Sequence, residues 1–450
     1  MVHLRVTAAQ SERRQRQAAA ALQLAGAVPG DRVAIAAGNH PDVISMALGG
    51  LRAGVIPVMV NEALLPHERQ VILDDCRPVV TLDGVAEVAA FVNSTLDQPA
   101  RDLGRAPMAR PMHYTSGTTG QPKGVWSGVL GEAGGAALLA EEIEMWGFTD
   151  EDVNLVCSPL YHSAPLRFAM STLAAGGDVV VLDKFSPESA SHAIAEHHPT
   201  VAFMAPAHLQ RLLSVPTGPP DFGSFRLLAH AGAPCPAPLK EQVLGCFPPD
   251  SVWEFYGATE GQFTACSTAD FLSHRGSVGK ARPHRQLRID SDTGQIWCTV
   301  PPYARFEYFG DAEKTKAAWC ADEFTVFDLG RLDGEGYLYL DGRRDDLIIS
   351  GGVNVYPLEL EIAISAMAGV EETAVFGVDD ERWGQRVCAA VVAAPGVLGD
   401  QVTVNALRTH IELVLAPYKR PKDVLVVTEI PHTPTGKVRR STLAADLGLR

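Results

Sequence analysis

One short segment, residues 114–125, concentrates residue types that could bind a phosphate chain. It reads Tyr-Thr-Ser-Gly-Thr-Thr-Gly-Gln-Pro-Lys-Gly-Val. The segment is too polar for a strand and too rich in glycine for a helix, so we expect a mobile loop. Its backbone N–H groups and hydroxyls would wrap a polyphosphate, with a lysine to offset charge. An ordinary polar turn is the alternative, although turns rarely need so many hydroxyls around one lysine.

This glycine-rich segment differs from a Walker A loop. Counting from Gly117, that motif requires a glycine where the chain has Pro122. The candidate phosphate-binding residues are Thr115, Ser116, Gly117, Thr118, Thr119, Gly120 and Lys123.

A second polar segment contains Tyr256, Gly257, Thr259 and Glu260 within five positions. The aromatic ring could stack on a base, the hydroxyl could contact a phosphate, and the carboxylate could bind magnesium. Mg²⁺ usually takes one or two carboxylates and completes its shell with water and phosphate. A strand end followed by a plain turn is the alternative interpretation.

Other candidates are weaker when each is taken alone. Gly232, Ala233 and Pro234 follow an expected strand, where small residues let a flat ligand approach the backbone. A plain β-turn is the favoured reading of that motif by itself. Asp328 and Arg343 flank a hairpin-like turn and could hold ribose hydroxyls or phosphate, although each alone is more often structural.

Three further positions lie near expected turns. Gly351 and Gly352 precede a strand and permit close approach of another chain to the backbone. Lys437 lies in a turn near the C-terminus, where a solvated lysine is the ordinary case. His162 follows a buried strand, and it could equally line a substrate pocket or be a satisfied core histidine.

The elements around these residues alternate between strand-like and helix-like patterns. Val33–Ala37 and Val55–Val60 are apolar runs, and Asp42–Gly54 between them is helix-like. This rhythm predicts βαβ units and a mainly parallel sheet with helices on both faces. From about Ile289, short strands separated by Gly, Asp and Pro predict a small antiparallel β segment. We therefore expect an α/β protein with an N-terminal domain over 1–344 and a small α+β domain over 345–450.

Composition restricts the class of protein. The 450 residues carry a net charge of −15, which argues against general nucleic-acid binding. Uninterrupted apolar runs stay well short of the roughly 18 residues of a membrane span, so we expect a cytoplasmic protein. The eight cysteines form no C-x-x-C pair and are expected to be reduced and mostly buried. Histidines and cysteines show no spacing typical of a zinc site.

Taken in order, these segments resemble the adenylate-forming superfamily of acyl-CoA ligases, luciferases and adenylation domains. The resemblance runs from about Gly30-Asp31 to Lys437, which is nearly the whole chain. It implies a large N-terminal domain that binds ATP and an acid, and a small C-terminal domain that rotates about Asp345.

The resemblance also implies a role for each candidate. The loop to Lys123 would hold the phosphates, Gly232–Pro234 and Tyr256 the adenine, and Thr259 the α-phosphate. Glu260 would bind Mg²⁺, Asp328 and Arg343 would hold ribose, and Lys437 would bridge the carboxylate and the α-phosphate. Gly351 and Gly352 would line a thiol tunnel, and Trp383, Tyr418 and Arg420 resemble positions that contact CoA.

The chain departs from the family pattern at several places. Val326-Phe327-Asp328 stands where Thr-Gly-Asp is usual, and Phe306-Glu-Tyr308-Phe309 replaces the usual Gly-Tyr motif. The chain is also shorter than typical members at the N-terminus and before Tyr114. The resemblance therefore does not assign the distal N-terminal part of the substrate pocket.

The segment after Tyr161-His162 lacks the aspartate that pairs with an amine in amino-acid-selecting relatives. Residues 417–450 carry seven Lys or Arg against three Asp or Glu, which suits the phosphates of CoA; a solvated basic tail is the alternative. We therefore expect an AMP-forming acyl-CoA ligase for a hydrophobic carboxylic acid, using ATP, Mg²⁺ and CoA. A ligase that loads a carrier protein, or a degenerate nucleotide-binding homologue, are the alternatives, and a homodimer is left open.

Overall fold

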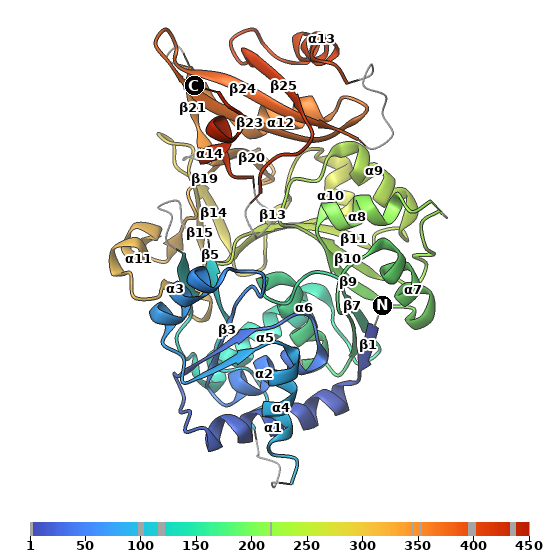
Figure 1. Ribbon diagram of the computed structural model, residues 1–450, viewed down its shortest axis with the longest axis vertical. Helices are drawn as coiled ribbons and strands as arrows, with labels where there is room; N and C mark the ends of the chain where they lie inside the picture. The colour runs from blue at the N-terminus through green and yellow to red at the C-terminus, as the bar shows by residue number, and fades with distance from the viewer. Residues whose placement is uncertain are drawn as a thin grey trace. The chain divides into compact units, whose positions relative to one another are not determined.

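The fold is described from a computed structural model of the chain (Figure 1). It describes residues 3–97, 103–115, 122–216, 218–343, 346–350, 353–394, 402–432 and 438–449. The chain forms two compact units. Unit 1 comprises residues 1–235, 241–287 and 298–326, and unit 2 comprises residues 236–240, 288–297 and 327–450. The expected boundary between Arg344 and Asp345 lies outside the described residues and stays a prediction.

Unit 1 contains an eight-stranded sheet with the order β1-β8-β7-β9-β10-β11-β12-β13. Its strands are β1 (His3–Val6), β7 (Val153–Val156), β8 (Asp178–Leu182), β9 (Val201–Met204), β10 (Leu227–His230), β11 (Val252–Gly257), β12 (Gln262–Ser267) and β13 (Lys280–Ala281). Strands β8, β7, β9, β10 and β11 run parallel, whereas β1, β12 and β13 pair antiparallel at the two sides. The expected mainly parallel sheet is confirmed.

A second sheet of unit 1 has the order β16-β6-β5-β3-β2-β4. Its strands are β2 (Arg32–Ala36), β3 (Ile56–Met59), β4 (Val80–Asp83), β5 (Met112–Thr115), β6 (Lys123–Trp126) and β16 (Glu307–Tyr308). Strands β2 to β5 are parallel neighbours, and β6 and β16 continue the sheet antiparallel. The central strands β2 and β3 are largely apolar because they are buried on both faces, and Val33, Ile35 and Val58 are fully buried.

The helices before residue 320 surround these sheets. They are α1 (Ala8–Leu24), α2 (Pro41–Arg52), α3 (Pro66–Cys76), α4 (Val85–Asn93), α5 (Gly131–Trp146), α6 (Ser163–Ala174), α7 (Pro187–His197), α8 (Pro206–Leu213), α9 (Ala237–Cys246), α10 (Thr268–Ser273), α11 (Ala312–Ala318) and the 3₁₀ turn η1 (Pro302–Ala304). Helix α1 begins at a capping box made by Thr7 and Gln10, and Asp311 caps α11. Helices α1, α2 and α4 lie side by side (Figure 1).

A small antiparallel sheet follows with the order β14-β15-β18-β17, as expected from the change of pattern near Ile289. Its strands are β14 (Gln286–Ile289), β15 (Ile296–Thr299), β17 (Trp319–Cys320) and β18 (Glu323–Phe324).

Unit 2 contains a hairpin and a five-stranded sheet. The hairpin is β19 (Asp328–Leu332) with β20 (Leu338–Arg343), and the sheet consists of β21 (Ile348–Ser350), β22 (Val353–Val355), β23 (Val370–Asp380), β24 (Gly384–Ala393) and β25 (Asp423–Val427). The helices are α12 (Pro357–Ser365), α13 (Val404–Val414) and α14 (Arg440–Asp446). Leu360, Leu407 and Val391 are fully buried in its core, which confirms the small α+β unit.

Two local expectations need correction. No strand was expected before Val33–Ala37, yet strand β1 precedes helix α1 and pairs with β8, with His3 opposite Leu182. The glycine-rich segment was expected to be loop throughout, yet Tyr114 and Thr115 end β5 and Lys123 begins β6. Among the described residues, no helix combines the length and apolar character needed to cross a membrane.

Candidate active site

The β5–β6 hairpin of unit 1 places Lys123. Thr115 lies opposite Lys123 and Tyr114 lies opposite Gly124 in the antiparallel ladder. A Cβ on Gly124 would lie 2.0 Å from Met112 Cε, so a larger residue here would have to displace that side chain. The expected phosphate-binding residues Ser116, Gly117, Thr118, Thr119 and Gly120 lie outside the described residues, and their role stays a prediction. The two strands nevertheless bring both ends of that segment together.

Lys123 forms an ion pair with the residue that caps a neighbouring helix. Its Nζ lies 3.4 Å from Asp311 Oδ2, and Asp311 Oδ1 accepts a hydrogen bond from the Lys314 backbone N–H. That backbone hydrogen bond, together with Lys123, lowers the pKa of Asp311. The lysine is therefore held by a carboxylate, at the edge where β6 pairs with β16.

Thr259 and Glu260 lie in the turn between β11 and β12. The Ala258 N–H donates to the Gly261 carbonyl across 2.8 Å, and a Cβ on Gly261 would lie 2.6 Å from the Phe324 ring. The turn is therefore tight and packs directly against an aromatic side chain, which explains the glycine at position 261.

Arg110 fixes this turn from the other side. Its guanidinium donates to the backbone carbonyl of Thr259 across 2.6 Å and to that of Glu260 across 3.0 Å. Desolvation lowers the pKa of Arg110 to about 10, so the side chain stays charged at neutral pH. No local pattern in the sequence indicates this residue, because its partners lie about 150 positions away.

Tyr308 of β16 contacts the Glu260 carboxylate. Its hydroxyl donates to Glu260 Oε1 across 2.9 Å, and the Glu260 residue is only 7% exposed. Desolvation and the adjacent carboxylate raise the pKa of Tyr308. Lys314 Nζ lies 4.0 Å from the centre of the Tyr308 ring, a cation–π contact. Tyr308 and Lys314 were not assigned roles from the sequence, although Tyr308 lies in the segment where the family pattern is altered.

The adenine candidates lie at the ends of neighbouring parallel strands. His230 of β10 is opposite Glu254 of β11, so Gly232 and Tyr256 each follow two positions later. Gly232 has a φ of 93°, which favours glycine, and Gly232–Pro234 are exposed. Ligands of open α/β sheets commonly bind at such carboxyl ends. The placement suits a flat ligand, and the contact with adenine stays a prediction.

His162 immediately precedes the first residue of α6, and its ring lies 4.5 Å from that of Tyr161. It is half-buried, so it is not enclosed in the core. The next residue, Ser163, lines a cavity of unit 1.

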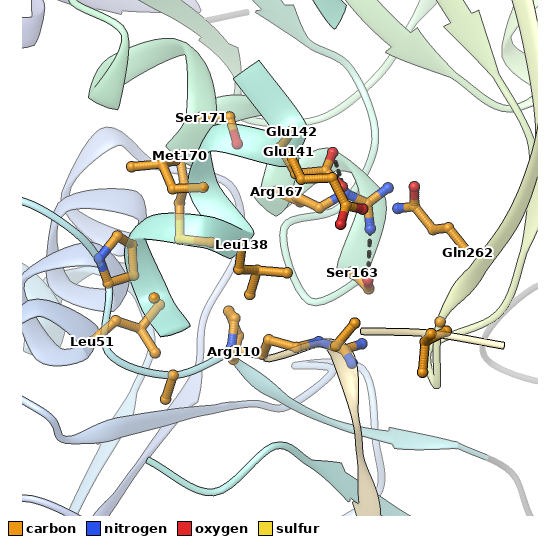
Figure 2. A pocket seen from close by; sticks show the side chains of 18 of the residues that line it. Leu51, Arg110, Leu138, Glu141, Glu142, Ser163, Arg167, Met170, Ser171 and Gln262 are labelled. Carbon is orange, nitrogen blue, oxygen red and sulfur yellow. Dashed lines mark hydrogen bonds and ion pairs between the residues drawn. The ribbon is translucent and has the colours of Figure 1, made fainter. Parts of the chain in front are cut away.

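That cavity lies beside the Thr259–Glu260 turn and has a volume of about 100 Å³. One side is apolar and includes Leu51, Leu138 and Met170, and the other carries polar groups (Figure 2). The polar lining residues are Arg110, His113, Glu141, Glu142, Ser163, Arg167, Ser171, Gln262, Arg282 and Arg285. The cavity is therefore amphipathic, with its polar side formed partly by residues that flank or contact the turn.

Buried ion pairs stiffen the polar side. Glu142 lies 3.0 Å from Arg282 and 3.2 Å from Arg167, and Glu141 lies 2.7 Å from Arg285. Burial alone would raise the pKa of Glu142, but Arg282 and Arg167 hold it below its ordinary value. Arg167 Nη2 is buried and has no hydrogen-bond partner within the part of the chain described.

Unit 2 brings together one expected pair. Asp328 of β19 lies directly opposite Arg343 of β20 in the hairpin ladder. The pairing agrees with a shared role at a ribose, which stays a prediction. Asp345, Gly351, Gly352 and Lys437 lie outside the described residues.

The expected CoA-contacting residues also lie in unit 2. Lys422 Nζ lies 4.9 Å from the centre of the Trp383 ring, and Tyr418 is 53% exposed. Arg420 donates to the carbonyls of Leu415 and Glu412, so its side chain also stabilises the C-terminal end of α13. Their contacts with CoA stay predictions.

Comparison with known proteins supports one family over most of the chain. Residues 2–301 match the AMP-binding enzyme family, and residues 359–437 match the AMP-binding enzyme C-terminal domain. The chain is 31% identical to an indoleacetate–CoA ligase of Aromatoleum aromaticum, over 94% of this chain and 89% of that protein. It is also 31% identical to a fatty acid–[acyl-carrier-protein] ligase, ScoC, of Streptomyces coeruleorubidus, over 97% and 91% of the two chains.

Solved structures agree. ATP-bound MatB from Rhodopseudomonas palustris superimposes with a TM-score of 0.83 at 28% identity, over 97% of this chain and 93% of that one. A Bacillus subtilis o-succinylbenzoate CoA synthetase in complex with its acyl-adenylate intermediate also gives a TM-score of 0.83 at 28% identity, over 97% and 92% of the two chains. The chain therefore belongs to the adenylate-forming superfamily of AMP-binding enzymes and is an acid–thiol ligase of the AMP-forming acyl-CoA synthetase type.

Proposed function

We propose that this ligase activates a hydrophobic carboxylic acid with MgATP and passes the acyl group to CoA. The observation that carries the substrate assignment is the amphipathic cavity beside the Thr259–Glu260 turn. Its polar side would receive the carboxylate end of the acid, and the side formed by Leu51, Leu138 and Met170 would receive the apolar body.

The residues of the turn suit a reaction at a phosphate. A carboxylate substrate is already a nucleophile, so adenylation needs charge compensation rather than a general base. Thr259 would donate to the α-phosphate and Lys123 would offset phosphate charge after leaving Asp311. Lys437 would then bridge the carboxylate and the α-phosphate while pyrophosphate departs.

Glu260 is the proposed magnesium ligand. Its carboxylate is held in place by the Tyr308 hydroxyl, and a hard cation prefers carboxylate oxygen with water and phosphate oxygens around it. When bound, Mg²⁺ would lower the repulsion between the carboxylate and the triphosphate. Tyr308 orients the carboxylate, and Arg110 holds the backbone that carries it.

The size of the cavity favours a compact acid. A dry cavity of about 150 Å³ can hold a benzene ring, and this one measures about 100 Å³. We therefore expect an aromatic, alicyclic or medium-length aliphatic acid in preference to a long chain. A role in fatty acid or lipid metabolism forms part of the proposal for an aliphatic acid. A cytoplasmic location is also part of the proposal.

Loading of a carrier protein is the second candidate, and it is favoured by the similarity to the ScoC ligase. CoA remains the first choice because Arg420, Lys422 and the other basic residues after position 417 suit its phosphates.

A panel of acids tests the assignment. AMP release with ATP, Mg²⁺ and CoA is measured for short, medium and long aliphatic, aromatic, alicyclic and steroid-type acids. Met170→Ala should widen the apolar side and shift the preference toward larger acids, whereas Leu272→Ala, at an exposed position, should not. No acid-dependent AMP release across the panel, or an unchanged preference in Met170→Ala, would contradict the assignment.

A further inference from the structure

A cluster of imidazoles and one carboxylate lies at the far edge of the eight-stranded sheet. His3 of β1 meets His197 and Glu196 at the end of α7, which Figure 1 shows close to the start of β1. One ligand atom from each of these three residues lies within 4.8 Å of the others. His192, one helical turn before Glu196, lies beside the same carboxylate.

The separations fit a shared ion. His3 Nδ1 lies 2.9 Å from His197 Nε2, and His3 Nε2 lies 3.6 Å from Glu196 Oε2. His197 Nε2 lies 3.7 Å from Glu196 Oε1, and His192 Nε2 lies 3.3 Å from Glu196 Oε2. Two ligand atoms on a tetrahedral zinc ion lie roughly 3.3 Å apart, given Zn–N distances of about 2.0 Å. Only one of the two His3 nitrogens can bind a given ion, but one ligand atom from each of His3, Glu196 and His197 lies within 4.8 Å of the others. Side-chain rotations would bring these three atoms onto one ion, and the exposed His192 could turn toward it.

The local fold explains why these residues meet. Strand β8 leads through a short loop into α7, whose start is capped by Ser186 and Pro187. The helix packs back over β7 and β8, and β1 pairs with β8 at the edge. His192 and Glu196 share one helix face because they are four residues apart.

Access and burial also fit a binding site. The side chains of His3 and His197 are each 13% exposed, whereas Glu196 is 52% and His192 is 70% exposed. Two ligands are thus held by packing, and the other two face solvent, where an ion could enter.

We propose that His3, Glu196 and His197, with His192 as a fourth ligand, bind a zinc-type divalent cation that ties β1 to α7. Imidazole ligands select zinc, copper, nickel or cobalt over magnesium or calcium. The ion would add to the contacts that hold the edge strand, which are its ladder with β8 and the ion pair of Arg5 with Asp178.

This site is separate from the proposed magnesium site. Four strands, β8, β7, β9 and β10, lie between β1 and the β11 strand that leads to Glu260. At about 4.8 Å per strand spacing, the two strands are roughly 24 Å apart. Zinc bound at β1 should therefore change stability without taking part in adenylation.

Calorimetric titration tests the proposal. Tag-free protein, stripped with a chelator and kept in excess Mg²⁺ to fill carboxylate sites that bind magnesium, is titrated with ZnCl₂. The wild type should bind one equivalent, and zinc should raise its thermal unfolding midpoint. His197→Ala and Glu196→Gln should each weaken zinc binding at least tenfold and abolish the thermal shift. Tetrahedral d–d absorption on adding Co²⁺ to wild type should disappear in both variants.

His198→Asn is the matched control, because His198 is the exposed neighbour outside the cluster and asparagine tolerates its φ of 47°. It should bind zinc as the wild type does. Thermal unfolding without metal checks that each variant is folded. Absence of zinc binding in the wild type, or equal zinc affinity in wild type, His197→Ala and Glu196→Gln, would overturn the proposal and leave a cluster held by its own hydrogen bonds.

Discussion

The Tyr308 hydroxyl donates a hydrogen bond to Glu260 Oε1 across 2.9 Å, and it joins the edge strand β16 to the turn between β11 and β12. The tyrosine lies in a segment where the chain departs from the usual family motif. Because the carboxylate is the proposed magnesium ligand, this contact decides how that carboxylate is aimed.

Tyr308→Phe should therefore reduce adenylation about tenfold, since partners that orient a metal ligand typically contribute 10–100-fold. The loss should shrink at high Mg²⁺, because weaker metal binding is then saturated. Glu260→Gln should cost more and should not be rescued by Mg²⁺. Pyrophosphate release across a Mg²⁺ titration measures both variants. An unchanged Mg²⁺ dependence in Tyr308→Phe would show that the hydrogen bond has no part in metal binding.

The cysteines provide an independent test, because the acyl-adenylate is itself the activated species. All eight are free thiols. Burial raises the pKa of Cys76 to about 11 and the pKa values of Cys157, Cys298 and Cys388 to about 12, so these thiols are protonated at neutral pH.

Replacing each cysteine in turn by Ala or Ser should leave turnover in every variant that remains folded. Acyl-CoA formation and circular dichroism are measured for each. One folded variant that forms adenylate but no acyl-CoA would reveal a cysteine relay.

One buried histidine, His113, and one half-buried histidine, His208, predict a loss of stability in acid. Burial lowers the pKa of His113 to about 3 and the pKa of His208 to about 4. The folded state then binds fewer protons than the unfolded state below the ordinary pKa of about 6.5. The contribution of the two histidines to the free energy of unfolding is complete above that pH and is lost as the pH falls toward 4.

Urea unfolding followed by tryptophan fluorescence, at pH values from about 7.5 to 4.5, measures this effect. His113→Gln and His208→Gln should each flatten the decline by up to about 1.4 kcal/mol per pH unit. His67→Gln, at an exposed position, should not. Equal slopes in all four proteins would show that these histidines are not kept neutral by folding.

Much of the fold follows from the sequence, and the long-range contacts of the site do not. Apolar runs such as Val33–Ala37 predict strands because parallel strands are buried on both faces. Strand β1 was missed because it is short and two of its four residues are exposed. The ends of the glycine-rich segment were assigned to a loop, yet Gly124 enters β6 because it leaves space for Met112.

The site shows the same limit. Glu260 and Lys123 were assigned roles from the sequence because each lies in a local cluster of polar and charged residues, and those roles stay predictions. Arg110 carries no such signal, and its contact with the Thr259 carbonyl depends on packing across 149 positions. The cluster of His3, Glu196 and His197 was missed for the same reason, since His3 and His197 are separated by 194 positions.

Substitutions at Lys437 and Asp345 should affect the two half-reactions, adenylation and transfer of the acyl group to CoA, differently. Lys437 would stabilise charge while pyrophosphate leaves, and this is not needed when a thiol attacks a preformed adenylate. Lys437→Ala should cripple adenylation and spare transfer to CoA from synthetic acyl-adenylate. Asp345→Pro should do the reverse, because a fixed φ restricts rotation at the hinge. Single-turnover mixing times each step. Equal loss of both steps in both variants, with folding intact, would exclude a mechanism in which the C-terminal domain rotates between adenylation and acyl transfer.

The acceptor thiol is the most direct test of the proposed function. Acyl-adenylate is formed on the enzyme from the best acid of the panel, and its discharge is timed separately with CoA and with a holo-carrier protein. We expect rapid formation of acyl-CoA with release of AMP, and slow or absent discharge by the carrier protein. Discharge by the holo-carrier protein alone, with adenylate stable in the presence of CoA, would contradict it.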